Sequence, residues 1–336
     1  MKLVLAAGVL AMVLAIALGP AFIAFLRRNA FGQQIREEGP AGHMTKQGTP
    51  TMGGVLLLSC SLLAFVIFSK HTAPALTVAG VTVACAAIGF VDDYFKLVHR
   101  RSLGLSGRWK LLLLAVVTAA LGYMAHREGL STDIYVPLID FRLNLGPVYY
   151  LFLFVVVAGA TNAVNLTDGL DGLAAGTMTI AMLTYTAMMV VAFLASGGLT
   201  AEGDTSRLDL GILAAALVGG CVGFLWYNAY PADVFMGDTG SFGLGGALAA
   251  VAVFTKTEFL LVLIGGVFVL EALSVLIQVV WFRSTGKRVF LMAPIHHHFE
   301  MLEWTENKII VRFWITASIC GASGFVLYYL AYSNFR

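Results

Sequence analysis

Apolar runs long enough to cross a lipid bilayer recur along almost the whole chain. Hydrophobic residues make up 59% of its 336 residues, and charged residues only 12%. A spanning helix needs roughly 20 apolar residues, and backbone groups in lipid must be hydrogen-bonded within their own segment. We therefore predict an all-α membrane protein, a polytopic bundle of about ten transmembrane helices that forms a single integral membrane domain over 1–336. The predicted spans are 2–26, 51–69, 75–91, 111–125, 148–164, 174–195, 210–227, 242–255, 259–281 and 313–332.

Positive charge is divided unequally between the two sets of loops. If the loop 27–50 is cytoplasmic, the alternate loops carry 14 of the 21 Lys and Arg residues. Because cytoplasmic loops are enriched in these residues, we predict both termini outside, in the periplasm, and the basic loops inside. Arg27 and Arg28 follow a long first apolar run, which favours a retained span over a cleaved signal peptide. The net charge of +2 does not indicate nucleic acid as a partner.

Polar clusters lie at the edges of several spans, on the face predicted to be cytoplasmic. The first is Asp92-Asp93, with Lys96 shortly after. If the preceding helix continues, Asp92 and Lys96 share a face while Asp93 points about 100° away. One carboxylate could then meet a metal or a nucleophile, and the lysine a phosphate. The alternative is an ordinary ion pair at a polar helix end.

A second cluster is the segment NLTDGLDGL, 165–173. We expect a helix to begin near Asn165, which would place Asp168 and Asp171 on one face, because residues three apart are neighbours on a helix. Gly169 would let a ligand approach the backbone closely. A helix N-terminus also attracts anions such as a diphosphate. The alternative is a helix start that is merely capped.

The third cluster is FMGDTGS, 235–241, which places Asp238 in a Gly-rich turn between two spans. Magnesium takes oxygen ligands from one or two carboxylates together with substrate phosphates. This pattern predicts Asp238 as a metal ligand. The alternative is an aspartate that caps the following helix.

The fourth cluster is the run of imidazoles at His296, His297 and His298. Neighbouring side chains diverge, so only His296 and His298 could converge, and only in an extended segment. Zinc usually requires three or four protein ligands. We therefore predict contact with phosphate or sugar rather than a zinc site, the alternative being a solvated polar loop.

One acid, Glu271, lies inside a predicted span. An ionisable residue within a membrane segment is a functional candidate by default. Gln278 lies seven residues later and therefore on the same helix face. Because Gln278 is nearer the cytoplasm, it could line the same cleft as the acidic clusters.

The simplest explanation for these clusters on one face is a single site. Acids, a metal and basic residues beside lipid suggest transfer of a phosphoryl-linked group onto a lipid acceptor. In that chemistry the metal neutralises a diphosphate and a carboxylate deprotonates or positions the acceptor. The distant alternative is an ion-coupled transporter, whose acids would lie near the bilayer midplane.

Five motifs occur in order along nearly the whole chain, and together they resemble the phospho-N-acetylmuramoyl-pentapeptide transferase family. This family is part of the polyprenyl-phosphate N-acetylhexosamine-1-phosphate transferase superfamily. The DDxxK and NxxDGLDGL patterns resemble the superfamily, and the HHHFE loop resembles the muramoyl-pentapeptide branch. The motifs are TKQGTPTMGG (45–54), GFVDDYFK (89–96), NAVNLTDGLDGLAAG (162–176), NAYPADVFMGDTGS (228–241) and APIHHHFE (293–300).

The resemblance implies transfer of phospho-MurNAc-pentapeptide from UDP-MurNAc-pentapeptide to undecaprenyl phosphate in the bacterial cytoplasmic (inner) membrane. The products would be lipid I and UMP, with Mg2+ as cofactor and the active site on the cytoplasmic face. The nearest alternative is a sister enzyme that uses UDP-GlcNAc and the same lipid. Direct attack and a covalent aspartyl intermediate both stay open, and a homodimer is compatible with the sequence.

The resemblance also implies roles for individual residues. Asp238 is similar to the metal ligand, with Asp168 as a further candidate. Asp92 looks like the residue that deprotonates the lipid phosphate, with Asp93 beside it and Lys96 near the phosphates. Phe235 falls where an aromatic ring can stack on uracil. The other residues predicted to bind substrate are Lys46, Asn165, Asp168, Gly169, Leu170, Asp171 and Gln278. His296, His297 and His298 are predicted to act in catalysis.

Overall fold

The computed structural model is a bundle of long helices. It describes residues 1–29, 48–99, 104–139, 141–198 and 204–333. Within these ranges nine helices are long and apolar enough to cross a membrane: α1 (Lys2–Arg28), α3 (Ala73–Val98), α4 (Gly107–Arg127), α5 (Val148–Thr167), α6 (Leu173–Ala195), α7 (Thr205–Asn228), α8 (Gly237–Phe254), α10 (Gly266–Thr285) and α12 (Glu306–Ser333). The predicted polytopic helical bundle is confirmed.

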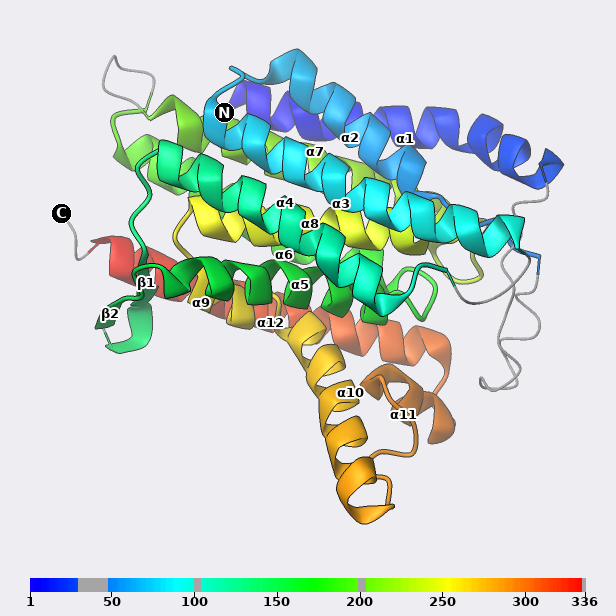
Figure 1. Ribbon diagram of the computed structural model, residues 1–336. Coiled ribbons are helices and arrows are strands. Elements are labelled where there is room, and N and C mark those ends of the chain that lie inside the picture. The colour runs from blue at the N-terminus through cyan, green and yellow to red at the C-terminus, as the bar shows by residue number, and fades with distance from the viewer. Residues whose placement is uncertain (30–47, 100–103, 140, 199–203, 334–336) are drawn as a thin grey trace.

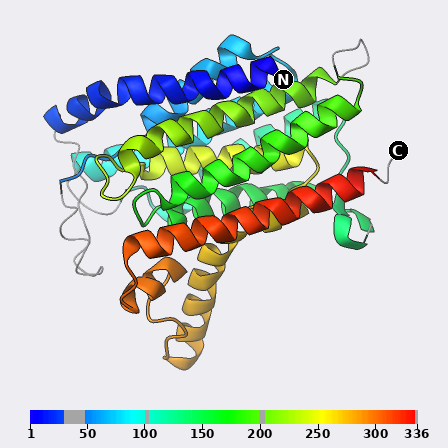
Figure 2. The ribbon, with the colours of Figure 1, turned by 180° about the vertical axis from the view of Figure 1, so that it is seen from behind.

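The start of α1 and the end of α12 lie at the same end of the bundle (Figure 1, Figure 2). This arrangement requires an even number of crossings. The tenth is supplied by α2 (Gly54–Phe68), which is apolar but shorter than the others. Which end of the bundle faces the cytoplasm stays a prediction.

The helices α7 and α8 form the centre of the bundle. Of the membrane-spanning stretch of each, 83% and 89% is buried, against 28% for α1. Both helices are rich in Ala and Gly, and small residues let helix backbones approach closely in a membrane. A Cβ atom at Gly219 of α7 would lie 1.9 Å from the carbonyl oxygen of Gly8 in α1. The neighbours of these helices therefore pack directly against their backbones.

Two predicted spans have different limits in the structure. The span expected at 242–255 is α8, which begins earlier, at Gly237, so that the Gly-rich turn belongs to the helix. The span expected at 259–281 is two helices, α9 (Glu258–Ile264) and α10, which are separated at Gly265. After this break α10 leaves the bundle at an angle (Figure 1), and exposes apolar side chains that include Leu270, Leu273 and Leu276.

Short elements lie at the two ends of the bundle. The all-α prediction misses a small hairpin of β1 (Asp133–Val136) and β2 (Phe141–Asn144), antiparallel with Asp133 opposite Asn144. A 3-10 helix, Pro137–Ile139, lies between the strands. At the opposite end the short helix α11 (Ile295–Met301) lies beside the lower part of α10 (Figure 1).

The contact between α3 and α8 gives the first testable prediction. A Cβ atom at Gly89 of α3 would lie 2.1 Å from the carbonyl oxygen of Asp238 in α8. Because the atom it meets is backbone, Gly89→Ala should push the helices apart and cost about 3 kcal/mol of stability. The measurement is the thermal unfolding midpoint in detergent.

Gly80→Ala is the matched control, since it lies on the same helix with no atom within 4 Å of its built Cβ. Alanine there should leave the midpoint unchanged or raise it slightly, because Ala favours a helix more than Gly does. Equal midpoints for the two variants would contradict the close contact.

Candidate active site at the junction of α3 and α8

Three carboxyl groups meet where α3 nears its end and α8 begins. Asp92 and Asp93 lie in the last turns of α3, and Asp238 lies in the first turn of α8. Each offers an oxygen atom within 4.8 Å of the others. All three are buried, and Asp92 has no exposed surface. The two acidic motifs, which are far apart in sequence, therefore form one cluster.

Two lysines lie among these carboxyl groups. The Nζ atom of Lys96 is 2.7 Å from Asp92 Oδ2 and 2.9 Å from Asp238 Oδ1. The Nζ atom of Lys110 is 3.0 Å from Asp92 Oδ1 and 2.9 Å from Asp238 Oδ2. The expected placement of Asp92 and Lys96 on one helix face is confirmed, and without substrate the two side chains form an ion pair. From the sequence, Lys110 is only one of the basic residues in the loops predicted to be cytoplasmic, and no local pattern marks it.

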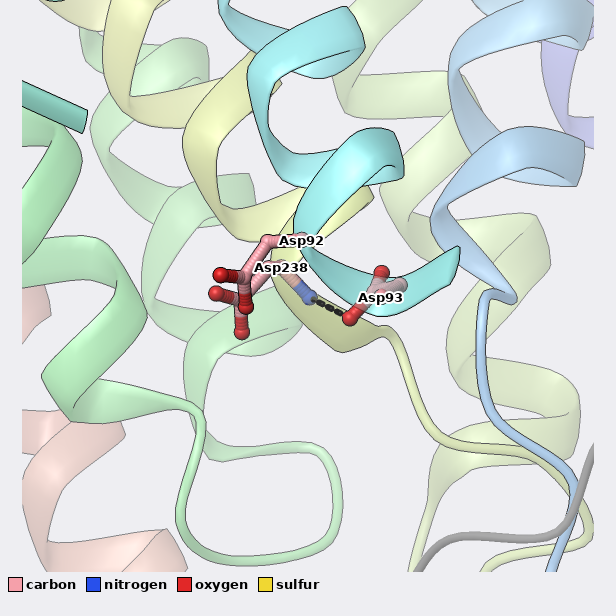
Figure 3. Close-up of side chains that lie close together, drawn as sticks. All are labelled: Asp92, Asp93 and Asp238. Atoms are coloured by element: carbon pink, nitrogen blue, oxygen red, sulfur yellow. Dashed lines mark hydrogen bonds between the residues drawn. The ribbon is translucent and has the colours of Figure 1, made fainter. Parts of the chain in front are cut away.

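Asp93 points away from the other two carboxyl groups (Figure 3). Its Oδ1 accepts from the backbone N–H of Asp238 at 3.1 Å, and its Oδ2 from the backbone N–H and the hydroxyl of Thr239, at 2.9 and 2.7 Å. The first N–H groups of a helix have no partners within it. Asp93 therefore caps the start of α8, while the Asp92 and Asp238 carboxyl groups lie side by side.

The backbone just before Asp238 strongly favours glycine. Gly237 has a φ of +75°, and a Cβ atom there would lie 2.7 Å from Asp93 Oδ2. L-residues rarely adopt such a φ. Asn165 then fixes Asp238 from α5, because its Nδ2 donates to Asp238 Oδ1 at 3.0 Å and to Ser241 Oγ at 2.9 Å.

The expected helix start near Asn165 is wrong. α5 continues through Thr167, and α6 begins only at Leu173, after Gly172 with a φ of +81°. Asp168 and Asp171 thus lie in a turn between two helices rather than on one helix face. The glycines cause the difference, since they allow a tight reversal where a continuous helix was expected.

Within this turn the two aspartates have different surroundings. Burial, and then the neighbouring carboxylates of Asp238 and Asp93, raise the pKa of Asp168 well above its usual range. Asp171 Oδ2 accepts from the backbone N–H of Ala232 at 3.0 Å. Asp168 therefore faces the cluster, and Asp171 ties the turn to the segment that precedes α8.

Three further predicted site residues make structural contacts. Leu170 is buried against Leu173 and Ile309. The backbone of Phe235 bonds Pro50 and Gly53, at 2.8 Å in both cases, which joins two of the sequence motifs. Gln278 Oε1 accepts from the backbone N–H groups of residues 289 and 290 and so holds the loop after α10. Lys46 lies outside the described residues.

The histidine run lies on the helix α11, so the extended segment in which His296 and His298 could converge is not formed. His296 is fully buried. His297 pairs with Glu300 one helical turn later, and His298 Nδ1 accepts from the backbone N–H of Leu291 at 3.2 Å. The rings of His296 and His298 do not converge, because successive helical side chains point about 100° apart.

The carboxyl cluster suits a hard cation. Among the described residues, Asp92, Asp93 and Asp238 form the one group of three His, Cys, Asp or Glu residues placed to share a metal ion. All its donors are oxygen, the ligand type that Mg2+ and Ca2+ prefer. Since Asp93 is engaged at the start of α8, Asp92 and Asp238 have the carboxyl oxygens that face each other. This geometry fits a divalent cation that prefers oxygen ligands.

Comparison with known proteins places the chain in a family. Residues 75–256 match the model for Glycosyl transferase family 4, and residues 46–58 match Phospho-N-acetylmuramoyl-pentapeptide-transferase signature 1. A protein named phospho-N-acetylmuramoyl-pentapeptide-transferase from Rubrobacter xylanophilus is 49% identical, covering 94% of this chain and 93% of its own. Proteins of the same name from Frankia alni and Desulfitobacterium hafniense are 44% and 46% identical, covering 98% and 96% of both chains. The chain belongs to the phospho-N-acetylmuramoyl-pentapeptide-transferase family.

Proposed function

We propose that this protein transfers phospho-MurNAc-pentapeptide from UDP-MurNAc-pentapeptide to undecaprenyl phosphate, with Mg2+ as cofactor. The products are lipid I and UMP, and the reaction takes place at the cytoplasmic face of the bacterial inner membrane. Family membership supports the group transferred. The observation that carries the chemistry is the buried cluster of three carboxyl groups and two lysines at one end of a membrane bundle.

Asp238 is the principal ligand proposed for Mg2+, with Asp92 beside it and Asp168 as a further candidate. When bound, the ion would neutralise the pyrophosphate of the donor and the charge on the departing UMP. The proposal draws on the proximity of the Asp92 and Asp238 oxygens (Figure 3). Asn165 would keep Asp238 in this orientation, since it already bonds the carboxylate.

Side chains of this protein are proposed to accept the proton of the lipid phosphate and to pair with the charged phosphate oxygens. Asp92 is proposed to accept the proton of the lipid phosphate, whose oxygen then attacks the sugar-linked phosphorus. The bond from this phosphorus to the bridging oxygen breaks, and UMP leaves. Lys96 and Lys110 are proposed to move from carboxylate to phosphate oxygens as the substrates enter, because an ammonium group pairs with either as a point charge.

The nucleotide-linked substrate is proposed to bind between the 168–171 turn, Phe235 and α11. Phe235 would stack on uracil, and His297 and His298 of α11 would contact the sugar-phosphate part. Lys46 and Gln278 stay predictions for the same pocket. A transporter is not favoured, because the acids gather at the end of α3 and the start of α8 rather than along the middle of the bundle.

The function is tested by UMP release from UDP-MurNAc-pentapeptide and undecaprenyl phosphate, with and without Mg2+. Wild-type enzyme should require the metal. Asp238→Asn should lower turnover by at least about 100-fold, because it removes a charged ligand, and should leave the far-UV spectrum unchanged.

Asp233→Asn is the control, since it changes an exposed acid of the same segment that pairs with Arg27. It should keep wild-type turnover. UMP release from UDP-GlcNAc alone would overturn the proposed donor, and normal turnover by Asp238→Asn would remove this residue from the metal site.

Lys110 supplies a prediction that the sequence motifs do not. Lys110→Met keeps most of the side-chain volume but removes the ammonium group between Asp92 and Asp238. Because two buried carboxyl groups then lose a shared partner, turnover should fall at least about tenfold. Arg108→Gln, an exposed cation in the first turn of the same helix, should have little effect. Steady-state UMP release measures both variants, and equal rates would restrict Lys110 to a topological role.

A further inference from the structure

A buried acid and histidine connect α10 to α11. Glu271 and His296 have no exposed surface, and His296 Nδ1 lies 3.0 Å from Glu271 Oε2. The other heteroatom of each group, Glu271 Oε1 and His296 Nε2, is buried without a hydrogen-bond partner. The large majority of buried polar side-chain atoms have at least one hydrogen-bond partner. Replacing both partners of a buried hydrogen bond with apolar groups of the same shape is often nearly neutral for stability, so a contribution to stability does not by itself explain this pair.

The far edge of the His296 ring lies against the turn between α5 and α6. A Cβ atom built on Gly169 would lie 2.3 Å from His296 Nε2 and 2.8 Å from Cε1. Any other residue at 169 would overlap the imidazole. Gly169 directly follows Asp168, whose carboxylate faces the cluster. The position of this turn therefore depends on where the imidazole lies.

We propose that Glu271 is a positioning residue, which orients His296 so that the imidazole supports the 168–171 turn in its substrate-binding position. The inference rests on the proposed function, in which this turn binds the nucleotide-linked substrate. An ionised carboxylate only accepts hydrogen bonds, so Nδ1 carries a proton and donates it. In the neutral imidazole Nε2 is then the unprotonated nitrogen, and it packs against Gly169.

Glu271, the acid within a predicted span, thereby has a role without direct contact with the substrate. Glu271 lies on the helix that leaves the bundle, and His296 extends from α11 back to the turn. A carboxylate that orients a ring through its Nδ1–H fixes both the tautomer and the ring plane, as it does for other functional histidines. Loss of the carboxylate should thus affect the turn and leave the Asp92–Asp238 pair in place.

The kinetic test uses Glu271→Gln, which keeps the shape of the side chain. The KM for UDP-MurNAc-pentapeptide should rise about tenfold, which corresponds to about 1.4 kcal/mol. The KM for undecaprenyl phosphate should stay unchanged, whereas a merely structural defect would lower the amount of folded enzyme. Glu258→Gln is the matched control, because Glu258 is equally buried, with an unpartnered Oε2, beyond the far end of α8. Its KM values should equal those of the wild type.

Double variants test whether Glu271 acts through His296. In a His296→Ala background, Glu271→Gln should add nothing to the KM for the nucleotide substrate, and additive penalties would overturn the proposal. Gly169→Ala should destabilise the wild-type protein but be tolerated in the His296→Ala background, since removal of the ring makes room for the methyl group. Equal losses in thermal midpoint would show that the ring does not support the turn.

Nitrogen NMR of histidine-labelled protein in detergent tests the geometry without substrate, with His296→Ala assigning the signal. The expected result is a protonated Nδ1 in the wild type, and a bare Nδ1 would overturn the proposal. This measurement decides the inference even if Glu271→Gln fails to fold. Absence of UMP release by wild-type enzyme would instead refute the proposed function, so the two failures are distinguishable.

Discussion

The cap that Asp93 places on the first turn of α8 is the interaction on which the site depends. α8 is the most buried spanning helix, and its first N–H groups would otherwise lie unbonded in the interior. A carboxylate from α3 meets them, which is feasible because Gly89 allows the two backbones to touch. Once the helices are joined there, Asp92 and Asp238 necessarily lie side by side. The geometry of the cluster thus follows from the capping of the α8 N-terminus by Asp93.

Burying three carboxyl groups together requires compensation, and the structure supplies it with two ammonium groups. Isolated buried charges are costly, whereas bonded pairs are tolerated. Lys96 comes from the same helix as two of the acids, so its pairing is local, while Lys110 comes from the start of α4. Such paired groups are also exchangeable, because a metal ion can replace an ammonium group beside a carboxylate and a phosphate can replace a carboxylate beside an ammonium group. The cluster therefore contains the kinds of charged group that can bind a cation and a phosphate.

Local sequence patterns correctly predicted the features that depend on nearby residues, such as spans and helix faces. Hydropathy identified the spans, and helical periodicity placed Asp92 and Lys96 on one helix face. The ordered motifs indicated the family, which is confirmed by relatives that match nearly the whole chain. The predictions that were wrong or missing concern reversals and breaks of the chain and contacts between residues far apart in sequence. Glycines after Asp168 and Asp171 end α5 and reverse the chain, although acids three apart also suit a helix face. Lys110 could not be distinguished from other loop cations, because only the packing of α4 brings it to the acids. The break at Gly265 occurs inside an apolar run that hydropathy reads as continuous.

A two-substrate enzyme of this family must bring a water-soluble donor and a lipid acceptor to one point, and the architecture separates these tasks. The acids and lysines lie at the end of the bundle, where helix termini and turns offer polar groups. α10 leaves the bundle nearby and exposes apolar side chains that suit lipid. The buried pair of Glu271 and His296 lies between these regions, in contact with the turn that carries Asp168. An acid within a membrane helix is costly in free energy. In its proposed role Glu271 orients His296, and through this ring it holds the 168–171 turn beside α10.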